Sequence, residues 1–288
     1  MLAPVNATMP SNVGGGALVA VTTDYPFGDM VTVVVQAKAA VELRIRIPGW
    51  AYNATLAIDG SGTTAVPADS VGSYHTIDCK LGRTLIELDL HPDIRVELGW
   101  GLTGMQTAAV VRGALLYALP LPLVKKLLHP PWACFETGCA EDMAFTSGAS
   151  WNYALMLPEA SANSTRSVSR TNEDAHDFTQ VARSGGRVVV NPPSLTFMQV
   201  GHPDKTPFAD ASPPVRITAR VRLLPGWHHD PKFPQSPAHP PASPVSCEGG
   251  DAACSEETTV ELVPYGSTRL RVAAFPWIAE PAEEERVV

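Results

Sequence analysis

Hydrophobic and polar residues alternate along several short segments of this 288-residue chain. At residues 41–47, 86–90 and 215–223, apolar residues occupy every second position, and charged or polar residues occupy the positions between them. Because a strand points successive side chains to opposite faces, this period of two predicts strands that are buried on one face. Residues 30–35 and 195–200 add two runs rich in residues that favour strands. The pattern predicts β-structure along most of the chain.

Helix is expected to be scarce. No segment combines a sustained apolar period of 3.6 with caps at both ends, and residues 119–128 are interrupted by Pro120 and Pro122. Many short strands separated by turn residues are typical of antiparallel sandwiches and barrels. The sequence therefore predicts an all-β protein, with two antiparallel β-sandwich domains in series and little helix.

The strand pattern also predicts where the domains begin and end. We expect a flexible N-terminal segment at residues 1–15, before the first strand-forming run. The first sandwich is expected at residues 16–101 and the second at residues 102–277. Residues 278–288 are acidic and lack core residues, so a disordered tail is expected there.

The second sandwich is expected to carry two long surface loops and a closing hairpin. The loop near residues 160–177 is polar and rich in Ser and Asn, and the loop near residues 225–257 is crowded with Pro and His. The hairpin is expected at residues 258–275, with its turn at residues 264–266 and Gly266 available for a positive φ.

Composition limits the classes of partner. Hydrophobic residues make up 45% of the chain, enough for a substantial core, and the formal net charge is −8. This charge argues against binding to nucleic acid or an anionic membrane, and favours a neutral partner such as a glycan. No apolar run reaches the roughly 20 residues of a membrane span, so a soluble protein is expected. The N-terminus lacks the features of a secretory signal; if the protein is secreted, the signal lies upstream.

The sequence shows no catalytic constellation. A glycosidase commonly uses two acidic groups that face each other across a sugar, whereas Glu42, Glu87 and Asp89 occupy outward positions of predicted strands. No nucleophile elbow, phosphate-binding loop or dinucleotide fingerprint occurs. We therefore expect neither a catalytic residue nor a cofactor in this chain.

The five cysteines fall into two close pairs and one single residue, Cys79. Cys134 with Cys139, and Cys247 with Cys254, could each close a local disulfide or remain as free thiols. A Cys-x4-Cys pair without a second pair of ligands is weak evidence for zinc, so no metal site is expected.

Two tryptophans are the candidate substrate-binding residues. Flat aromatic faces can stack against sugar rings, but aromatics on alternating strands usually belong to the core. Trp132 and Trp227 lie in predicted loops, where exposure is expected. They are therefore the candidates for contact with a glycan.

Several phrases occur in an order and at separations that resemble the C-terminal β-sandwich region of the β-L-arabinofuranosidase-like enzymes of glycoside hydrolase family 127. They are TDYPFG at residues 23–28, LRIRIPGW at 43–50, RGALLY at 112–117, WNYAL at 151–155 and LVPYGSTRLR at 262–271. The third phrase departs from the family's pattern, which normally has proline where Ala114 stands. The resemblance spans most of the chain.

The resemblance implies that the chemistry of such an enzyme lies elsewhere. In this family an N-terminal (α/α)6 barrel supplies a cysteine nucleophile and a zinc-bound cysteine cluster with a nearby glutamate, and no part of this chain matches those motifs. The leading hypothesis is therefore a non-catalytic β-sandwich portion that supports the missing barrel and contacts an L-arabinose-containing glycan. The alternative is a free-standing carbohydrate-binding or cell-surface module. An autonomous hydrolase would require an acid pair that converges in a cleft.

Overall fold

The computed structural model describes residues 4–9, 16–100, 107–127, 143–158, 188–201, 208, 213–230, 233–237, 239–248 and 253–280. Within these residues the chain is almost entirely strand, and the helical elements are two 3₁₀ turns, η1 (Ala68–Ser70) and η4 (Tyr265–Ser267). The predicted all-β class is therefore confirmed. No helix in the described part of the chain is long and apolar enough to cross a membrane.

The chain forms two compact units. The first consists mainly of residues 1–93 with the turn at residues 112–114, and the second contains most of the remaining chain. The expected division differs by one strand, because β9 (Ile94–Trp100) belongs to the second unit. Its neighbours in the sheet are β15 and β10, so its backbone hydrogen bonds are made there.

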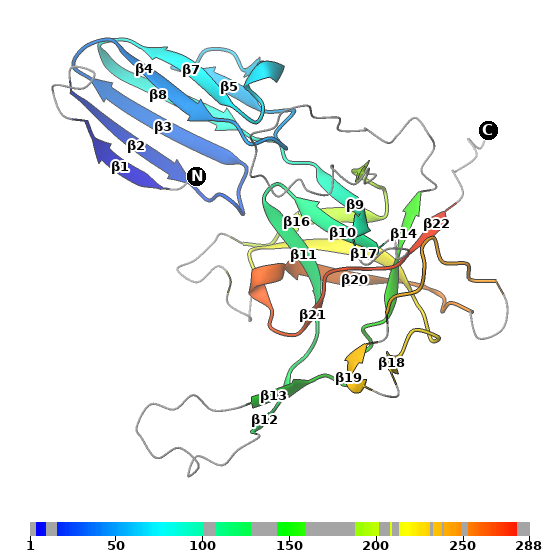
Figure 1. The fold of residues 1–288 in the computed structure, drawn as a ribbon. Helices are drawn as coiled ribbons and strands as arrows, with labels where there is room; N and C mark the ends of the chain where they lie inside the picture. The colour runs from blue at the N-terminus through cyan, green and yellow to red at the C-terminus, as the bar shows by residue number, and fades with distance from the viewer. Residues whose placement is uncertain are drawn as a thin grey trace, which may run out of the picture. The chain divides into compact units, whose positions relative to one another are not determined.

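The first unit contains two sheets (Figure 1). The larger has the strand order β1 (Val5–Thr8), β2 (Ala17–Thr23), β3 (Met30–Ala37), β8 (Gly82–Asp89), β5 (Thr55–Ile58) and β6 (Thr64–Ala65). The smaller pairs β4 (Val41–Arg46) with β7 (Tyr74–Cys79). The expectation of a flexible segment at residues 1–15 is wrong for β1, which pairs in antiparallel register with β2.

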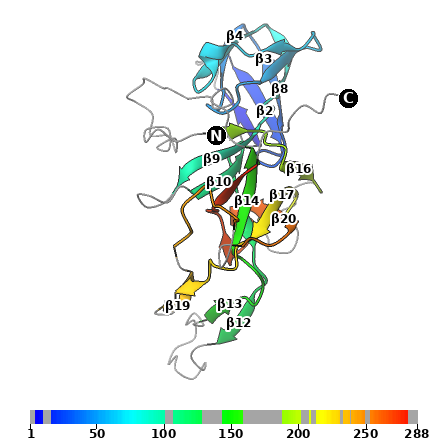
Figure 2. The same cartoon turned by 90° about the vertical axis from the view of Figure 1, so that its right-hand side faces the viewer.

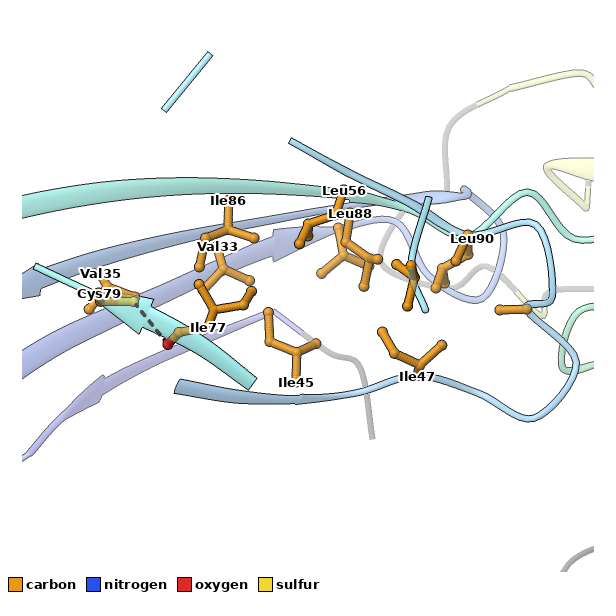
Figure 3. Packing of buried hydrophobic residues seen from close by; sticks show 14 of the residues in the cluster. Val33, Val35, Ile45, Ile47, Leu56, Ile77, Cys79, Ile86, Leu88 and Leu90 are labelled. Carbon is orange, nitrogen blue, oxygen red and sulfur yellow. Dashed lines mark hydrogen bonds between the residues drawn. The ribbon is translucent and has the colours of Figure 1, made fainter. Parts of the chain in front are cut away.

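The core of the first unit lies between its two sheets (Figure 3). Val33 of β3 and Ile86 of β8 are cross-strand partners and are buried, as the alternating pattern predicts. Ile45 of β4 and Ile77 of β7 approach them from the smaller sheet. The charged residues between them point to the outer faces, so a two-layer sandwich follows directly from the period of two.

In the described part of the second unit, most strands form one hydrogen-bonded path (Figures 1 and 2). Its order is β15 (Val188–Val190), β9, β10 (Thr107–Arg112), β11 (Leu115–Pro120), β20 (Glu257–Pro264), β17 (Val215–Leu223), β14 (Tyr153–Pro158) and β22 (Trp277–Glu280). In addition, β16 (Leu195–Gln199) pairs with β17, and β21 (Arg271–Val272) pairs with β11. Two short ladders join β12 (Val124–Leu127) to β13 (Met143–Thr146), and β18 (His229–Asp230) to β19 (Phe233–Pro237).

Strand β17 carries the alternation most clearly. Val215, Ile217, Ala219 and Val221 are completely buried, whereas the residues between them are partly exposed. One face of this strand therefore belongs to the core, and the other presents arginines to the surface, as the sequence predicts.

Two expectations for the C-terminal region are wrong. Residues 258–275 do not form a hairpin, because β20 and β21 both pair with β11, one after the other along that strand. The turn between them is η4, and Gly266 has no positive φ. The tail was expected to be disordered from residue 278, yet β22 pairs in parallel with β14 through Glu280. An unpaired edge of β14 supplies hydrogen-bond partners that an apolar pattern alone does not reveal.

Candidate functional site

The two predicted substrate-binding tryptophans do not form an exposed platform in the structure. Trp132 lies outside the described residues. Trp227 is only 6% exposed and packs against Trp151, with ring centroids 4.8 Å apart at an angle of 74°. With Leu224 and Ala154 it forms a small core cluster. The expected exposure of Trp227 is therefore wrong, and its ring faces are not available for stacking on a sugar.

Three of the sequence phrases meet at one end of the first unit. Tyr25, from TDYPFG, stacks on Trp50, from LRIRIPGW, with ring centroids 6.5 Å apart and an interplanar angle of 3°. Gly113, from RGALLY, lies so close that an added Cβ would be 3.4 Å from the Trp50 ring. Asp29 directly follows the first phrase and is hydrogen-bonded to Arg112. We call Tyr25, Asp29, Trp50, Arg112 and Gly113 the motif cluster.

The ion pair of the motif cluster is bidentate. Arg112 donates from Nη1 to Asp29 Oδ1 at 3.0 Å and from Nη2 to Asp29 Oδ2 at 2.6 Å. The Arg112 side chain is 10% exposed and that of Asp29 is 33% exposed. Short paired hydrogen bonds of this kind fix orientation as well as charge. The backbone carbonyl of Asp29 also accepts from the Leu90 N–H, which ties together two loops at this end of the unit.

The contacts of the motif cluster join several loops of the first unit. Burial raises the pKa of the Tyr25 phenol, so the hydroxyl stays protonated near neutral pH. The Asp29 carboxylate is matched by a guanidinium on both of its oxygens. The bidentate ion pair and the stacked rings fix the loops that carry them relative to one another.

Gly113 allows the close approach to Trp50. It has a φ of +57°, and an added Cβ would also lie 3.4 Å from Pro92. We expect Gly113→Ala to reduce stability by about 2 kcal/mol, because the left-handed conformation costs about 1–2 kcal/mol for an L-residue and the methyl group adds crowding. The measurement is thermal unfolding followed by tryptophan fluorescence.

Gly60 provides the matched control for Gly113. It has a φ of +72° but no atom within 4 Å of an added Cβ, so Gly60→Ala isolates the cost of the backbone conformation. Equal losses of stability in the two variants would show that contact with Trp50 contributes nothing.

A histidine network lies nearby in the first unit. His91 Nε2 is 3.1 Å from Thr55 Oγ1, and His91 Nδ1 is 3.5 Å from Asp89 Oδ1. This order of groups is that of a nucleophile, a base and an orienting acid. However, the His91 side chain is 47% exposed, and the contact to Asp89 is longer than a charge-assisted hydrogen bond. The arrangement is a surface network and lacks a firmly oriented base.

The second unit contains a groove of about 720 Å³ beside β14, β17 and β22. Glu257 accepts from Arg220 Nε at 2.6 Å and from Arg220 Nη2 at 3.1 Å, and Glu280 accepts from the same Nη2 at 2.6 Å. Two carboxylates thus converge on one guanidinium. We refer to this hollow as the β17 groove.

The Glu257 carboxylate of the β17 groove does not match the requirement for the general acid of a glycosidase. Hydrogen bonds from Arg220 lower the pKa of the Glu257 carboxyl, so it remains ionised near neutral pH. The general acid of a glycosidase must carry a proton, which requires a raised pKa. Glu257 can accept hydrogen bonds, but it cannot protonate a leaving group.

The lowered pKa of Glu257 can be tested directly. A group with a depressed folded pKa contributes stability above its unfolded pKa and loses that contribution as the pH falls through the folded value. We expect a carbon-detected NMR titration to give a midpoint below the ordinary value of 4.5, and Arg220→Met to move it upward. Arg216→Met is the control, because Arg216 pairs with Glu261 instead. An unchanged midpoint in Arg220→Met would contradict the assigned cause.

One of the two close cysteine pairs forms a disulfide in the structure. Cys247 and Cys254 form a disulfide, with their Cα atoms 5.1 Å apart. Cys134 and Cys139 lie outside the described residues, and Cys79 is a buried free thiol whose pKa is raised by burial. Within the described part of the chain, no group of three or more His, Cys, Asp or Glu residues could hold a metal ion.

A family model matches most of the first unit. Residues 6–91 match the family model described as the middle domain of GH127 β-L-arabinofuranosidase. The first unit resembles a GH127 middle domain. The predicted family resemblance is therefore confirmed for this part of the chain. No curated protein sequence matches the chain.

Solved structures of glycoside hydrolases align with almost the whole chain. A structure named glycoside hydrolase is 14% identical, with a TM-score of 0.48, and the alignment covers 95% of this chain and 34% of that chain. The GH127 β-L-arabinofuranosidase of Geobacillus stearothermophilus T6 is 15% identical, with a TM-score of 0.46, and the alignment covers 97% of this chain and 33% of that chain. Another GH127 β-arabinofuranosidase is 12% identical, with a TM-score of 0.49, and the alignment covers 96% of this chain and 34% of that chain. The chain thus spans about a third of the length of these structures.

The GH127 middle-domain match contains only part of the motif cluster. Tyr25, Asp29 and Trp50 lie within the matched residues, whereas Arg112 and Gly113 come from later in the chain. Sequence reasoning noted the phrases on both sides but missed the pairing of Asp29 with Arg112. The available signal was their place in the sequence, because Asp29 directly follows TDYPFG and Arg112 begins RGALLY.

Proposed function

We propose that this chain is the non-catalytic β-sandwich portion of a β-L-arabinofuranosidase-like glycoside hydrolase, which supports a catalytic (α/α)6 barrel and contacts its glycan. The observation that carries the proposal is the match of residues 6–91 to the GH127 middle domain. The motif cluster adds a physical basis, since it holds the loops at one end of this unit in a fixed arrangement. Fixed loops are what a supporting surface requires.

The charges in the described residues are consistent with a supporting role. Glu257 and Glu280 share one guanidinium in the β17 groove, and Asp29 is paired with Arg112. Each of these carboxylates accepts hydrogen bonds from an arginine, and the pKa of Glu257 is lowered by Arg220, whereas glycoside hydrolysis also needs a protonated acid. We therefore assign the bond-breaking step to the barrel partner, with any zinc-bound cysteine site located there.

Reconstitution of activity tests this proposal. The purified chain is assayed on p-nitrophenyl β-L-arabinofuranoside alone, and again after addition of a separately expressed GH127 barrel domain. We expect hydrolysis by the mixture to exceed that of the barrel alone, and no hydrolysis by the chain alone. Hydrolysis by the chain alone would overturn the non-catalytic assignment, and a barrel unaffected by the chain would overturn the supporting role.

A free-standing carbohydrate-binding module is the second candidate function. The β17 groove favours it, because this groove combines apolar walls with fixed charged groups and lies within the second unit. Retention of the isolated chain on an arabinan column, together with failure to affect the barrel, would support this candidate over the first.

Export from the cell is part of the proposal. The Cys247–Cys254 disulfide is of a kind that persists in oxidising compartments. Two Asn-x-Ser/Thr sequons, at Asn6 and Asn53, have exposed asparagines. Expression of the chain behind a secretory signal, followed by mass spectrometry for the disulfide and for glycans, tests this part.

A further inference from the structure

The β17 groove has a mixed wall. Its apolar part includes Met156 of β14 and Ile278 of β22, which are cross-strand partners in the parallel ladder. Val245 lies on the adjacent loop, and its backbone N–H donates a hydrogen bond to the carbonyl of Trp277 at 2.8 Å. Cys247 extends the same wall and is fixed by its disulfide. The sheet of β14, β17 and β22 forms one side of the groove, and the segment with Val245 and the disulfide-bonded Cys247 lines the other.

One guanidinium in the groove, that of Arg222, makes no hydrogen bond within the described residues, although its charge acts on Glu257. Arg222 is the cross-strand partner of Glu257, but Arg220 occupies both carboxylate oxygens of Glu257. Among the described residues, Arg222 makes no hydrogen bond or ion pair, and its Nε is buried without an acceptor. Buried polar atoms in native proteins almost always have a hydrogen-bond partner. The Nη groups of Arg222 line the groove and also make no hydrogen bond within the described residues, so they can donate to an acceptor from a ligand or from solvent.

The balance of charge defines the class of ligand. Arg220 and Arg222 carry two positive charges, and Glu257 and Glu280 carry two negative charges, so these four side chains are together neutral. Glu248 adds a negative charge to the lining. A ligand carboxylate would be repelled by this arrangement, whereas a hydroxyl group can accept from Arg222 and donate to a glutamate.

We propose that the β17 groove binds a neutral sugar unit through a pair of adjacent hydroxyl groups. One hydroxyl oxygen accepts from the fork of Arg222, and the neighbouring hydroxyl donates to Glu257 or Glu280. The apolar face of the ring lies against Met156, Ile278 and Val245. Pockets that combine apolar walls with a few fixed polar groups are typical of small-ligand sites.

This inference rests on the glycan contact, which belongs to the proposed function and to the second candidate alike, and it can fail separately from the supporting role. The test uses the ¹⁵N-labelled full chain without any barrel, titrated with methyl β-L-arabinofuranoside to millimolar concentrations. Arginine Nε–H and backbone amide signals are followed by NMR. We expect saturable shifts for Arg222 and for the amides of Ile278 and Ala279, which line the groove. Reconstitution of barrel activity is measured on the same preparation, so the two proposals give independent results.

Two arginine variants distinguish this groove from the rest of the sheet. Arg222→Met keeps the apolar stem but removes the guanidinium, and we expect roughly tenfold weaker binding from the loss of charge-assisted hydrogen bonds. Arg216→Met is the control, because Arg216 lies on the same strand and face but does not line the groove. Thermal unfolding of each variant confirms folding.

Three results would overturn the inference. The first is the absence of saturable shifts with the neutral sugar. The second is equal binding by Arg222→Met and the unaltered chain. The third is binding of galacturonate in preference to the uncharged sugar, which would show that the groove is an anion site. Weaker binding in Arg222→Met alone, with Arg216→Met unaffected, would support the inference.

Discussion

Leu88→Ala is expected to lower the stability of the first unit by about 2–5 kcal/mol, the usual cost of a buried leucine truncation. Leu88 is completely buried and is the cross-strand partner of both Val31 and Leu56. Its side chain occupies the middle of the core between the two sheets (Figure 3). Truncation removes apolar contacts and leaves a cavity that strands on both sides resist closing. Chemical denaturation gives the free energy, and hydrogen exchange of β3 and β8 locates the loss.

Leu81 provides the matched control for Leu88. Its side chain is 73% exposed, so Leu81→Ala removes the same atoms without opening a cavity. We expect a change within about 0.5 kcal/mol for this surface substitution. Comparable losses in the two variants would mean that the core of the first unit does not lie between its sheets as the structure has it.

The elements that were predicted correctly are those in which local pattern and tertiary burial agree. In β17, alternate residues such as Ile217 and Ala219 are buried on one face, and Arg220 lies on the other. The same holds for β8, where Ile86 and Leu88 face the core. Side-chain direction in a strand follows from the backbone alone, so a period of two can be interpreted without knowledge of the partner strand.

The errors arise where an element is defined by a distant partner. Strand β22 is short, contains no clean alternation and precedes an acidic run in the sequence, but it pairs in parallel with β14. Trp227 lies in a Pro-rich stretch and was expected to be exposed, but Trp151 and Leu224 enclose it. In both cases the decisive contact joins residues that are far apart in sequence, and a single sequence does not report such contacts.

The β17 groove combines both situations. The outward positions of Arg220 and Arg222 were predicted from alternation. Their partners were not, because the register that places Glu257 opposite Arg222 depends on the pairing of β17 with β20. A one-residue change of register would turn Glu257 to the opposite face. Charge alone therefore predicted a polar surface. Only the register shows that Arg220 is hydrogen-bonded to two carboxylates, whereas Arg222 makes no hydrogen bond within the described residues.

Asp29→Ala is expected to destabilise the first unit by about 3 kcal/mol, the lower end of the range for breaking a buried ion pair. The change removes both hydrogen bonds to Arg112, whose side chain is 10% exposed. Loss of the carboxylate removes the main compensation for the desolvation of the Arg112 charge. Asp29→Asn keeps one acceptor and should give an intermediate loss. Chemical denaturation of the two variants measures the difference.

The exposed pair Arg44–Glu42 supplies the control for Asp29. Its Nε–Oε1 distance is also 2.6 Å, but the two side chains are 68% and 48% exposed. Exposed pairs contribute about 0–1 kcal/mol, so Glu42→Ala should leave stability nearly unchanged despite the equal distance. If the motif cluster supports a barrel, Asp29→Ala should also reduce the activity recovered on mixing, whereas Glu42→Ala should not. Equal stability losses would show that burial does not set the strength of the Asp29–Arg112 pair. Lost stability without lost activity would separate the fold of this cluster from its proposed supporting role.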